Sequence, residues 1–365
     1  MPDKPVVLTI LPHLAGFDSC FPLIERLHQR GRVGTETWLG PRLRQTEPRV
    51  VQAFDRAGMA HRDVSVLRLE LGARRAIRAA DAVLTHSDPI AYGKRTRPRD
   101  RWMIKGPASI LFVQHGMKQH GLNYAHDGKV FQFAADLMLV WDQRAKQGQG
   151  TLYNTAPGAI VSLCGPTKTN RLAARPLPDP LVKQFSSYRQ RVLICHNYGF
   201  EALNYDDAAM RRSFAQWRQV FEARADTLFV LRSHRGKGLT ALGDATETLV
   251  QGLENVIVSK RHDGFMKFAG IHDILPYMDR VISHPSTVVW DALSVERPVA
   301  MIDNTWPDLA DLRQIRTIDD FLAYLDCADP MAEAASLLTE LGSIDANLDC
   351  AADQVERFLG VANVG

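Results

Sequence analysis

The sequence has few cysteines, and none of them is spaced as metal ligands are. The five are scattered along the 365 residues, and no pair shows the close spacing of a zinc site. An odd number also argues against a disulfide framework. We therefore expect no metal, and five reduced cysteines that are mostly buried. They are Cys20, Cys164, Cys195, Cys327 and Cys350.

Long hydrophobic runs are also absent. No apolar stretch approaches the roughly 20 residues that cross a bilayer. The first residues, MPDKPVVLTIL, contain an acid and too short an apolar core for a signal peptide. The sequence has no zinc, helix-turn-helix or RNA-binding signature. These absences predict a cytoplasmic protein that does not bind nucleic acid.

Length and composition are those of a folded protein with two domains. The chain is long for one core, and its 45% hydrophobic and 23% charged residues are ordinary for a globular protein. The net charge of +3 hides an asymmetry between the halves. Residues 1–165 hold 23 Lys and Arg against 14 Asp and Glu, a balance of +9, which leaves −6 for residues 166–365.

The densest basic cluster is KRTRPRDRWMIK, residues 94–105. The segment from Arg95 to Lys105 includes Trp102, and a basic loop with a tryptophan can rest on an anionic membrane surface. It can equally hold an anionic acceptor or be a solvated loop. A peripheral contact with the inner face of the cell membrane is therefore one of three interpretations that the sequence leaves open.

Strands and helices alternate in both halves of the chain, which predicts an α/β fold. The segment VVLTIL (6–11) is typical of a buried strand. Residues 18–30 are typical of a helix, which Asp18 would cap and Gly31 would end. We expect two Rossmann-like, doubly wound domains that face a central cleft. The expected boundaries are 1–165 for an acceptor-side domain and 166–340 for a nucleotide-donor domain, with a C-terminal helix at 341–365 that can pack back on the first domain.

In the first domain, His115 and Gly116 directly follow a predicted strand in FVQHGMKQHG. Ligands bind at the carboxyl ends of strands in such folds. A histidine there can act as a general base on a hydroxyl group. Gly116 would allow a close ligand approach, and Lys118 would position the acceptor. The alternative is a structural histidine.

In the predicted second domain, two strands end in polar residues. Arg232 and His234 lie in FVLRSHRGKG, where their charge and hydrogen bonds suit a diphosphate. His196 and Asn197 end LICHNYG and would contact a base, ribose or sugar hydroxyl. A solvated charged turn is the alternative for the first pair, and a structural role is favoured for the second.

The most informative segment is DRVISHPSTVVWDALSVERPVAMID, residues 279–303. It predicts a strand, a polar turn, a helix and a second parallel strand. Ser286 and Thr287 would cap the helix and hold a phosphate. His284 would lie near the phosphates, and Asp291 would accept a ribose hydroxyl or complement the helix dipole.

Taken in order, the HG pair, the RSH segment and residues 279–303 resemble the GT-B architecture. Within it they resemble bacterial CDP-glycerol glycerophosphotransferases and capsule-synthesis transferases. The resemblance implies that His115 is the base and His234 the donor-phosphate stabiliser. It also implies that Ser286 and Thr287 replace a serine pair, with Asp291 as the acidic residue. The sequence departs from the family pattern because Arg235 follows His234, whereas Pro285 follows His284. Either histidine can therefore be the stabiliser.

The leading hypothesis is a metal-independent, inverting transferase of the GT-B type. It would move a sugar or polyol-phosphate unit from a CDP-, CMP- or UDP-linked donor to a bacterial surface polysaccharide or a lipid-linked glycan. The nucleotide-activated donor would be a substrate, and no cofactor is expected. The alternatives are a nucleotide-sugar 2-epimerase of similar fold, which needs no acceptor, and a non-catalytic subunit that binds glycan or nucleotide.

Overall fold

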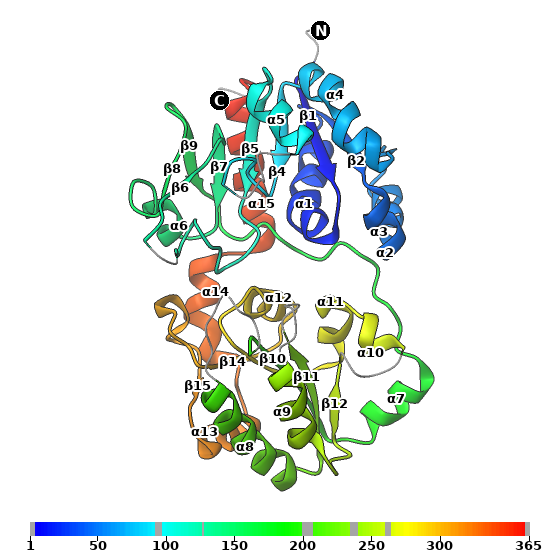
Figure 1. The fold of residues 1–365 in the computed structure, drawn as a ribbon, viewed down its shortest axis with the longest axis vertical. Coiled ribbons are helices and arrows are strands. Elements are labelled where there is room, and N and C mark those ends of the chain that lie inside the picture. The colour runs from blue at the N-terminus through cyan, green and yellow to red at the C-terminus, as the bar shows by residue number, and fades with distance from the viewer. Residues whose placement is uncertain are drawn as a thin grey trace. The chain divides into compact units, whose positions relative to one another are not determined.

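The chain divides into two compact α/β units, Met1–Ala173 with Leu341–Gly365, and Ala174–Glu340. Figure 1 shows the fold in a computed structural model that describes residues 4–91, 97–125, 128–198, 207–233, 240–259 and 264–361. In the described part of the chain, no helix combines the length and apolar character that crossing a membrane requires.

Each unit contains one parallel sheet with the strand order of a Rossmann fold. In the first unit the order is β3-β2-β1-β4-β5-β7-β9, and in the second it is β12-β11-β10-β13-β14-β15. Every pairing in both sheets is parallel. The order reverses between β1 and β4 and between β10 and β13, and such switch points are where doubly wound sheets bind ligands. The expected fold class is confirmed for each unit.

The elements of the first unit lie close to their expected positions. Its strands are β1 (Val6–Leu11), β2 (Gly34–Leu39), β3 (Arg62–Asp63), β4 (Ala82–Thr85), β5 (Ser109–Val113), β7 (Leu137–Val140) and β9 (Ile160–Leu163), with a small pair of β6 (Phe131–Gln132) and β8 (Tyr153–Asn154). Its helices are α1 (Leu14–Arg30), α2 (Pro41–Thr46), α3 (Arg49–Arg56), the π-helix η1 (Arg68–Gly72), α4 (Ala73–Ala79), α5 (Pro98–Lys105), α6 (Gln143–Gln147) and α15 (Ile344–Phe358).

The second unit repeats the pattern. Its strands are β10 (Gln190–His196), β11 (Thr227–Ser233), β12 (Val256–Val258), β13 (Arg280–Ser283), β14 (Val299–Ile302) and β15 (Gln314–Ile315). Its helices are α7 (Asp179–Ser186), α8 (Asp207–Ala223), α9 (Thr240–Val250), α10 (Phe265–Phe268), α11 (Ile271–Ile274), α12 (Val288–Leu293), α13 (Ile318–Asp326) and α14 (Ala335–Leu341), which ends at the division between the units. The 3₁₀ turns are η3 (Leu275–Tyr277), η4 (Pro307–Leu309) and η5 (Ala332–Ala334).

Three aspartates fix the register of neighbouring strands. Asp81, Asp136 and Asp279 each stand one residue before a strand, β4, β7 and β13 respectively. Each carboxylate accepts a backbone N–H at the start of an adjacent strand, from Val6, Ile110 and Arg191, at 2.7 Å in every case. The aspartate N–H donates to the carbonyl of the same partner residue. Each aspartate thus closes a two-bond ring that aligns the amino ends of the two strands.

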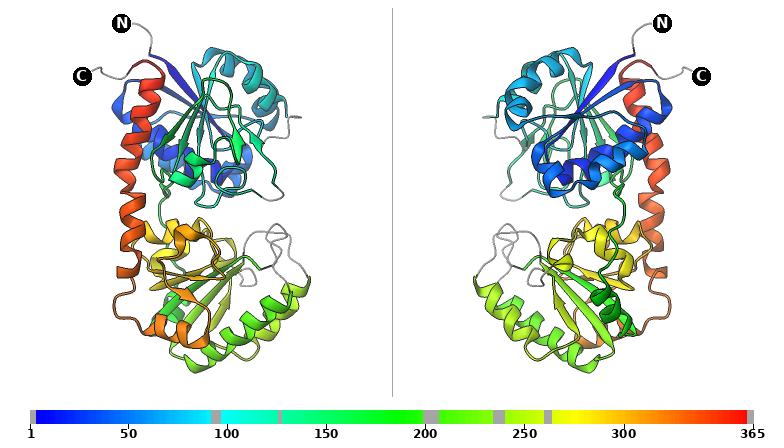
Figure 2. Two further views of the ribbon diagram at one scale, coloured as in Figure 1. Left: turned by 90° about the vertical axis from the view of Figure 1, so that its left-hand side faces the viewer. Right: turned by 90° about the vertical axis from the view of Figure 1, so that its right-hand side faces the viewer.

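Helices cover both faces of the first sheet. Alternate strand residues point to opposite faces, so Val7 packs with α1, α3 and α15 while Leu8 packs with η1, α4 and α5. Figure 2 shows α15, in red, beside the blue elements of the first unit, and this C-terminal helix contributes Leu348 and Val355 to its core.

Two sequence expectations about boundaries need correction. Helix α1 begins at Leu14, with His13 as its N-cap, so Asp18 lies buried inside the helix instead of capping it. The division between the units falls after Ala173, not at residue 165. The intervening residues are held by the first unit, because Asn347 donates to the Pro166 carbonyl and Arg49 to that of Ala173.

A buried carboxylate anchors the C-terminal helix. Glu356 on α15 is fully buried, and its Oε2 lies 2.9 Å from Nη1 of Arg32 and 3.5 Å from Nη1 of Arg30. On the surface of the same helix, Asp345 is 74% exposed and pairs with Arg26. The same helix therefore offers a buried and an exposed ion pair for comparison.

We predict that Glu356→Ala lowers the free energy of unfolding by about 2–3 kcal/mol, because it removes the charge-assisted bond to Arg32 and leaves a cavity at a fully buried position. Asp345→Ala is the matched control and should cost less than about 1 kcal/mol, since its pair is exposed. Urea denaturation measures both. Similar losses for the two variants would contradict the anchoring role of Glu356.

Candidate functional site

Three histidines line the carboxyl edge of the first sheet. His13 follows β1, His86 follows β4 and His115 follows β5, and these three strands are neighbours. The His13 and His86 ring centroids are 5.2 Å apart and those of His86 and His115 are 5.5 Å apart, both pairs edge to face. The row spans the switch point between β1 and β4.

The sequence analysis selected His115 and missed His13 and His86. A signal for both was present, because each follows a predicted strand by one or two residues. Their common position became meaningful only when the strand order placed β1 and β4 side by side.

All three imidazoles are held neutral. Burial lowers the pKa of His115 to about 4, with a further contribution from the charge of Lys168. Burial also lowers the pKa of His86 well below its ordinary value, helped by His115 and His13. The pKa of His13 is lowered by burial and then by Arg99 and other guanidinium groups.

The hydrogen bond of His115 fixes which ring nitrogen is available. Its Nδ1 lies 3.2 Å from the carbonyl oxygen of His86. A carbonyl only accepts, so the neutral ring carries its proton on Nδ1 and leaves the Nε2 lone pair as an acceptor. This partly buried imidazole can therefore take a proton from a hydroxyl group, although its low pKa makes it a weak base.

Buried amides hold the loop that follows β5. The side chain of Gln119 accepts the His115 N–H at 3.0 Å, and that of Asn123 accepts the Gln119 N–H at 2.9 Å. Gln114 donates to the carbonyl of Gly116 at 2.8 Å. Lys118 lies over the Tyr124 ring at 4.9 Å, and burial lowers its pKa. The predicted residues Gly116 and Lys118 thus belong to a rigid loop beside His115.

In the second unit, His284 is fully buried and uses both ring nitrogens. The backbone N–H of Asn197, after β10, donates to Nδ1 of His284 at 2.8 Å. Nε2 must then carry the proton, and it donates to Oδ2 of Asp303 at 3.1 Å. The direct phosphate contact expected of His284 does not fit this geometry. His284 instead ties the turn after β13 to the ends of β10 and β14.

Asp303 completes this network from a left-handed backbone conformation. Its φ is +47°, which aspartate tolerates better than most residues. Its Oδ2 also accepts the hydroxyl of Tyr198 at 2.6 Å, while 45% of its side chain is exposed. The bonds from His284 and Tyr198 lower the pKa of Asp303 against the opposing effect of burial. Asp303 was not a candidate from sequence, whereas Tyr198 belongs to the predicted polar end of LICHNYG.

The burial of His196 and Asn197 agrees with the structural role that the sequence favoured over a ligand contact. His196 is 4% exposed, and its ring packs 5.6 Å from Phe214 and 5.9 Å from Trp217. Asn197 is 7% exposed, and its side chain lies 3.5 Å from the carbonyl of Pro285. Both residues shape the end of β10, because their side chains are directed into the unit.

The remaining predicted residues of the second unit lie on β11, in the turn after β13 and on α12. They are Arg232, Ser286, Thr287 and Asp291. Two guanidinium nitrogens of Arg232 bond the Ser259 hydroxyl and the Ala269 carbonyl, at 3.0 and 2.7 Å. Ser286 accepts the Val288 N–H at 3.3 Å, so the capping prediction is confirmed for Ser286. Thr287 occupies the N-cap position of α12, but its side chain makes no capping bond.

Asp291 is buried, and its Oδ1 lies 3.9 Å from Nε2 of His272. The expected ribose contact of Asp291 stays a prediction. His234 lies outside the described residues. The burial of His284 argues against His284 as the phosphate stabiliser, and the role expected of His234 stays a prediction.

Two further features concern ligands. Within the described ranges, no group of histidine, cysteine and acidic side chains could hold a metal ion.

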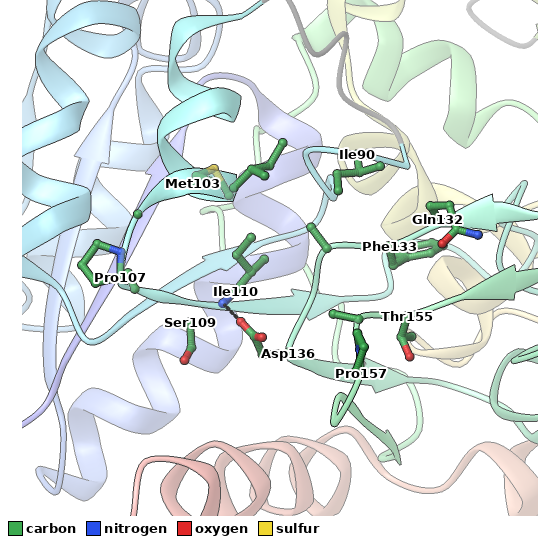
Figure 3. A pocket seen from close by; sticks show the side chains of 15 residues that line it. Ile90, Met103, Pro107, Ser109, Ile110, Gln132, Phe133, Asp136, Thr155 and Pro157 are labelled. Carbon is green, nitrogen blue, oxygen red and sulfur yellow. Dashed lines mark hydrogen bonds between the residues drawn. The ribbon is translucent and has the colours of Figure 1, made fainter.

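A cavity of about 640 Å³ lies in the first unit beside α5, lined by Met103, Ile104, Ile110 and Phe133 among other residues. Figure 3 shows Asp136 bonded to the Ile110 N–H in its wall. The three-histidine row does not line this cavity.

We predict that His115 titrates near pH 4 and that Lys168→Met raises this midpoint, because the variant removes a nearby positive charge. NMR of the histidine ring signals between pH 3 and 8 measures it. Lys146→Met, on exposed α6, is the control and should leave the midpoint unchanged. A midpoint near 6.5 in the unmodified protein would contradict the burial of the ring.

A second prediction concerns Asp303→Asn, which keeps the shape of the side chain and removes its charge. A lowered pKa stabilises the fold above the ordinary pKa, and this contribution is lost as the pH falls through the lower folded value. The variant should therefore melt about 2–4 °C lower at pH 6, and the difference should shrink as the pH falls below the ordinary carboxyl value of about 3.8. Exposed Asp311→Asn is the control for general acid effects. A pH-independent difference would contradict the role of the charge.

The sequence matches no protein-family model and no curated protein. Solved structures match over nearly the whole chain. The S. aureus MnaA–UDP co-structure is 11% identical, with a TM-score of 0.65 and 98% of each chain covered. UDP-GlcNAc 2-epimerase from Neisseria meningitidis, bound to UDP-GlcNAc, is 12% identical, with a TM-score of 0.56 and coverage of 97% of this chain and 100% of that one.

The UDP-GlcNAc 2-epimerase from Methanocaldococcus jannaschii is 9% identical, with a TM-score of 0.57 and coverage of 98% and 100%. At these identities the likeness shows the fold alone. The fold is that of GT-B enzymes with two Rossmann-like units, and the narrower resemblance to CDP-glycerol glycerophosphotransferases remains a prediction from sequence.

Proposed function

We propose that this chain is an enzyme that acts on a nucleotide-activated sugar. The observation that carries the proposal is that each unit places polar side chains at the switch point of a Rossmann-like sheet. The first unit offers an imidazole acceptor on His115, and the second offers a turn held by His284 and Asp303. Structural neighbours that contain UDP or UDP-GlcNAc support a nucleotide-linked substrate.

In this proposal the second unit holds the nucleotide. Ser286 and Thr287 lie at the start of α12, where hydroxyl groups and the positive end of the helix dipole suit phosphate oxygens. Arg232 and His234 would offset charge on the departing nucleotide, and Asp291 would accept a ribose hydroxyl. His284 and Asn197 would position the turn without touching the ligand.

The first candidate reaction is epimerisation at C2 of the sugar. Its support is the likeness to UDP-GlcNAc 2-epimerases, which spans nearly the full length of both chains. Such a reaction needs no acceptor. His115 would then move a proton on the sugar itself.

The second candidate is transfer of a sugar or polyol-phosphate unit to a glycan or lipid-linked acceptor. The tautomer of His115 is compatible with it, since Nδ1 is bonded and the Nε2 lone pair remains an acceptor. A general base on an acceptor hydroxyl needs such a nitrogen. A non-catalytic subunit that binds nucleotide remains the third interpretation.

Incubation with single donors separates these reactions. UDP-GlcNAc and CDP-, CMP- and GDP-linked donors are supplied without acceptor, and products are followed by NMR. A new 2-epimer supports the first candidate. Turnover only after a glycan acceptor is added supports the second. Nucleotide binding by thermal shift without any turnover would favour the binding subunit, and no binding of any nucleotide would refute the proposal.

We predict that His115→Ala lowers turnover more than about 100-fold, the scale usual for a lost acid–base group. The thermal shift given by the nucleotide should persist, because nucleotide is assigned to the second unit. His28→Ala, an exposed histidine on α1, is the control and should retain full activity. Loss of nucleotide binding together with turnover would contradict the role of His115.

A further inference from the structure

One surface of the first unit exposes apolar and basic side chains together. It is formed by residues 64–80 and 97–106, which contain η1, α4 and α5, three elements that contact one another. We call it the η1–α5 surface. In Figure 1, α4 and α5 lie on the outside of the first unit.

Some apolar side chains of this surface are exposed and do not pack in the core. Leu69, Ile77 and Met103 point inward and pack against the sheet. Their neighbours point outward, with Val66 63%, Leu67 68%, Leu71 55% and Ile104 38% exposed.

The clustering of these residues distinguishes them from ordinary surface hydrophobics. Nine large apolar side chains are exposed in the described part of the chain, and four of them lie on this surface, three within six residues. Single exposed apolar residues are normal, whereas several on neighbouring elements are consistent with a binding surface.

The exposed charged residues within 64–80 and 97–106 are all cations, and the exposed acids Asp63 and Asp81 flank the first range. Seven exposed cations lie on it: Arg68, Arg74, Arg75, Arg78, Arg97, Arg101 and Lys105. In residues 64–80 and 97–106 the two acids are not exposed, because Asp100 is buried and Glu70 is partly buried near Arg99. The surface therefore attracts an anionic partner.

We propose that the η1–α5 surface docks the protein on an anionic lipid bilayer. Val66, Leu67 and Leu71 would enter the headgroup region, and the cations around them would pair with lipid phosphates. The sequence pointed to Arg95–Lys105 alone for a membrane contact. The structure adds the apolar residues and four arginines of η1 and α4, while Arg95 lies outside the described residues.

The charge argues against a second copy of the chain as the occupant. A twofold contact would bring the same seven cations of each copy together, and like charges at an interface repel. A bilayer meets both requirements of the surface, since it offers apolar depth beneath a layer of negative charge.

The cavity beside α5 continues the apolar surface. Ile104 belongs to both, and the cavity is also lined by Met103, Ile90 and Phe133, which Figure 3 labels. Its volume of about 640 Å³ lies in the range that small ligands occupy.

Vesicle co-sedimentation tests the proposal without any sugar substrate, so its outcome is independent of the proposed function. The protein should bind vesicles that contain phosphatidylglycerol at least 10-fold more tightly than pure phosphatidylcholine, and 0.5 M NaCl should abolish the preference. Leu67→Ser with Leu71→Ser should weaken binding at least 10-fold. Arg74→Gln, Arg75→Gln and Arg78→Gln together should weaken it about 100-fold.

Phe268→Ser is the matched control, because Phe268 of the second unit is 70% exposed and should not affect lipid binding. Melting temperatures check that the variants fold. Equal binding to both vesicle types, or unchanged binding by either set of substitutions, would overturn the proposal. So would a dimer in light scattering that Leu67→Ser and Leu71→Ser dissociate, or binding to an acidic protein with none to vesicles.

Discussion

Parallel pairing of the first strand of each unit with a strand on either side is the constraint on which the rest depends. β1 lies between β2 and β4, and β10 lies between β11 and β13. Asp81 and Asp279 close hydrogen-bonded rings at the amino ends of these pairs, so register is set there. Since parallel strands end at one edge, the residues that follow β1 and β4, or β10 and β13, must meet.

Because strand pairing joins residues that are distant along the chain, only the features that depend on local patterns could be predicted from the sequence. Strand β1 and helix α8 follow from local hydrophobic patterns, and His115 follows from its place directly after a strand. The partners of His115 could not be found in this way. His13 and His86 lie about a hundred and about thirty residues away along the chain, and only the strand order makes them neighbours.

His284 shows the opposite error. A histidine before Pro285 and Ser286 resembles a phosphate-binding turn, and nothing local indicates that the ring is buried. Its two hydrogen bonds come from Asn197 and Asp303, each supplied by a different strand end. Whether a polar side chain faces a ligand or the interior is decided by such distant partners, and a local motif does not record them.

Basic residues in the first unit serve two separate environments. Arg99 is 8% exposed and, with Lys168, helps to keep the histidine row uncharged. The arginines of α4 and the cations of α5 instead face outward. Of the basic residues in the excess of +9 in residues 1–165, Arg26, Arg30 and Arg32 pair with acids of α15. Others are divided between the inner edge, beside the uncharged imidazoles, and the outer surface. A count of charges cannot separate these two roles. Burial decides whether an arginine lies beside the histidines or faces outward.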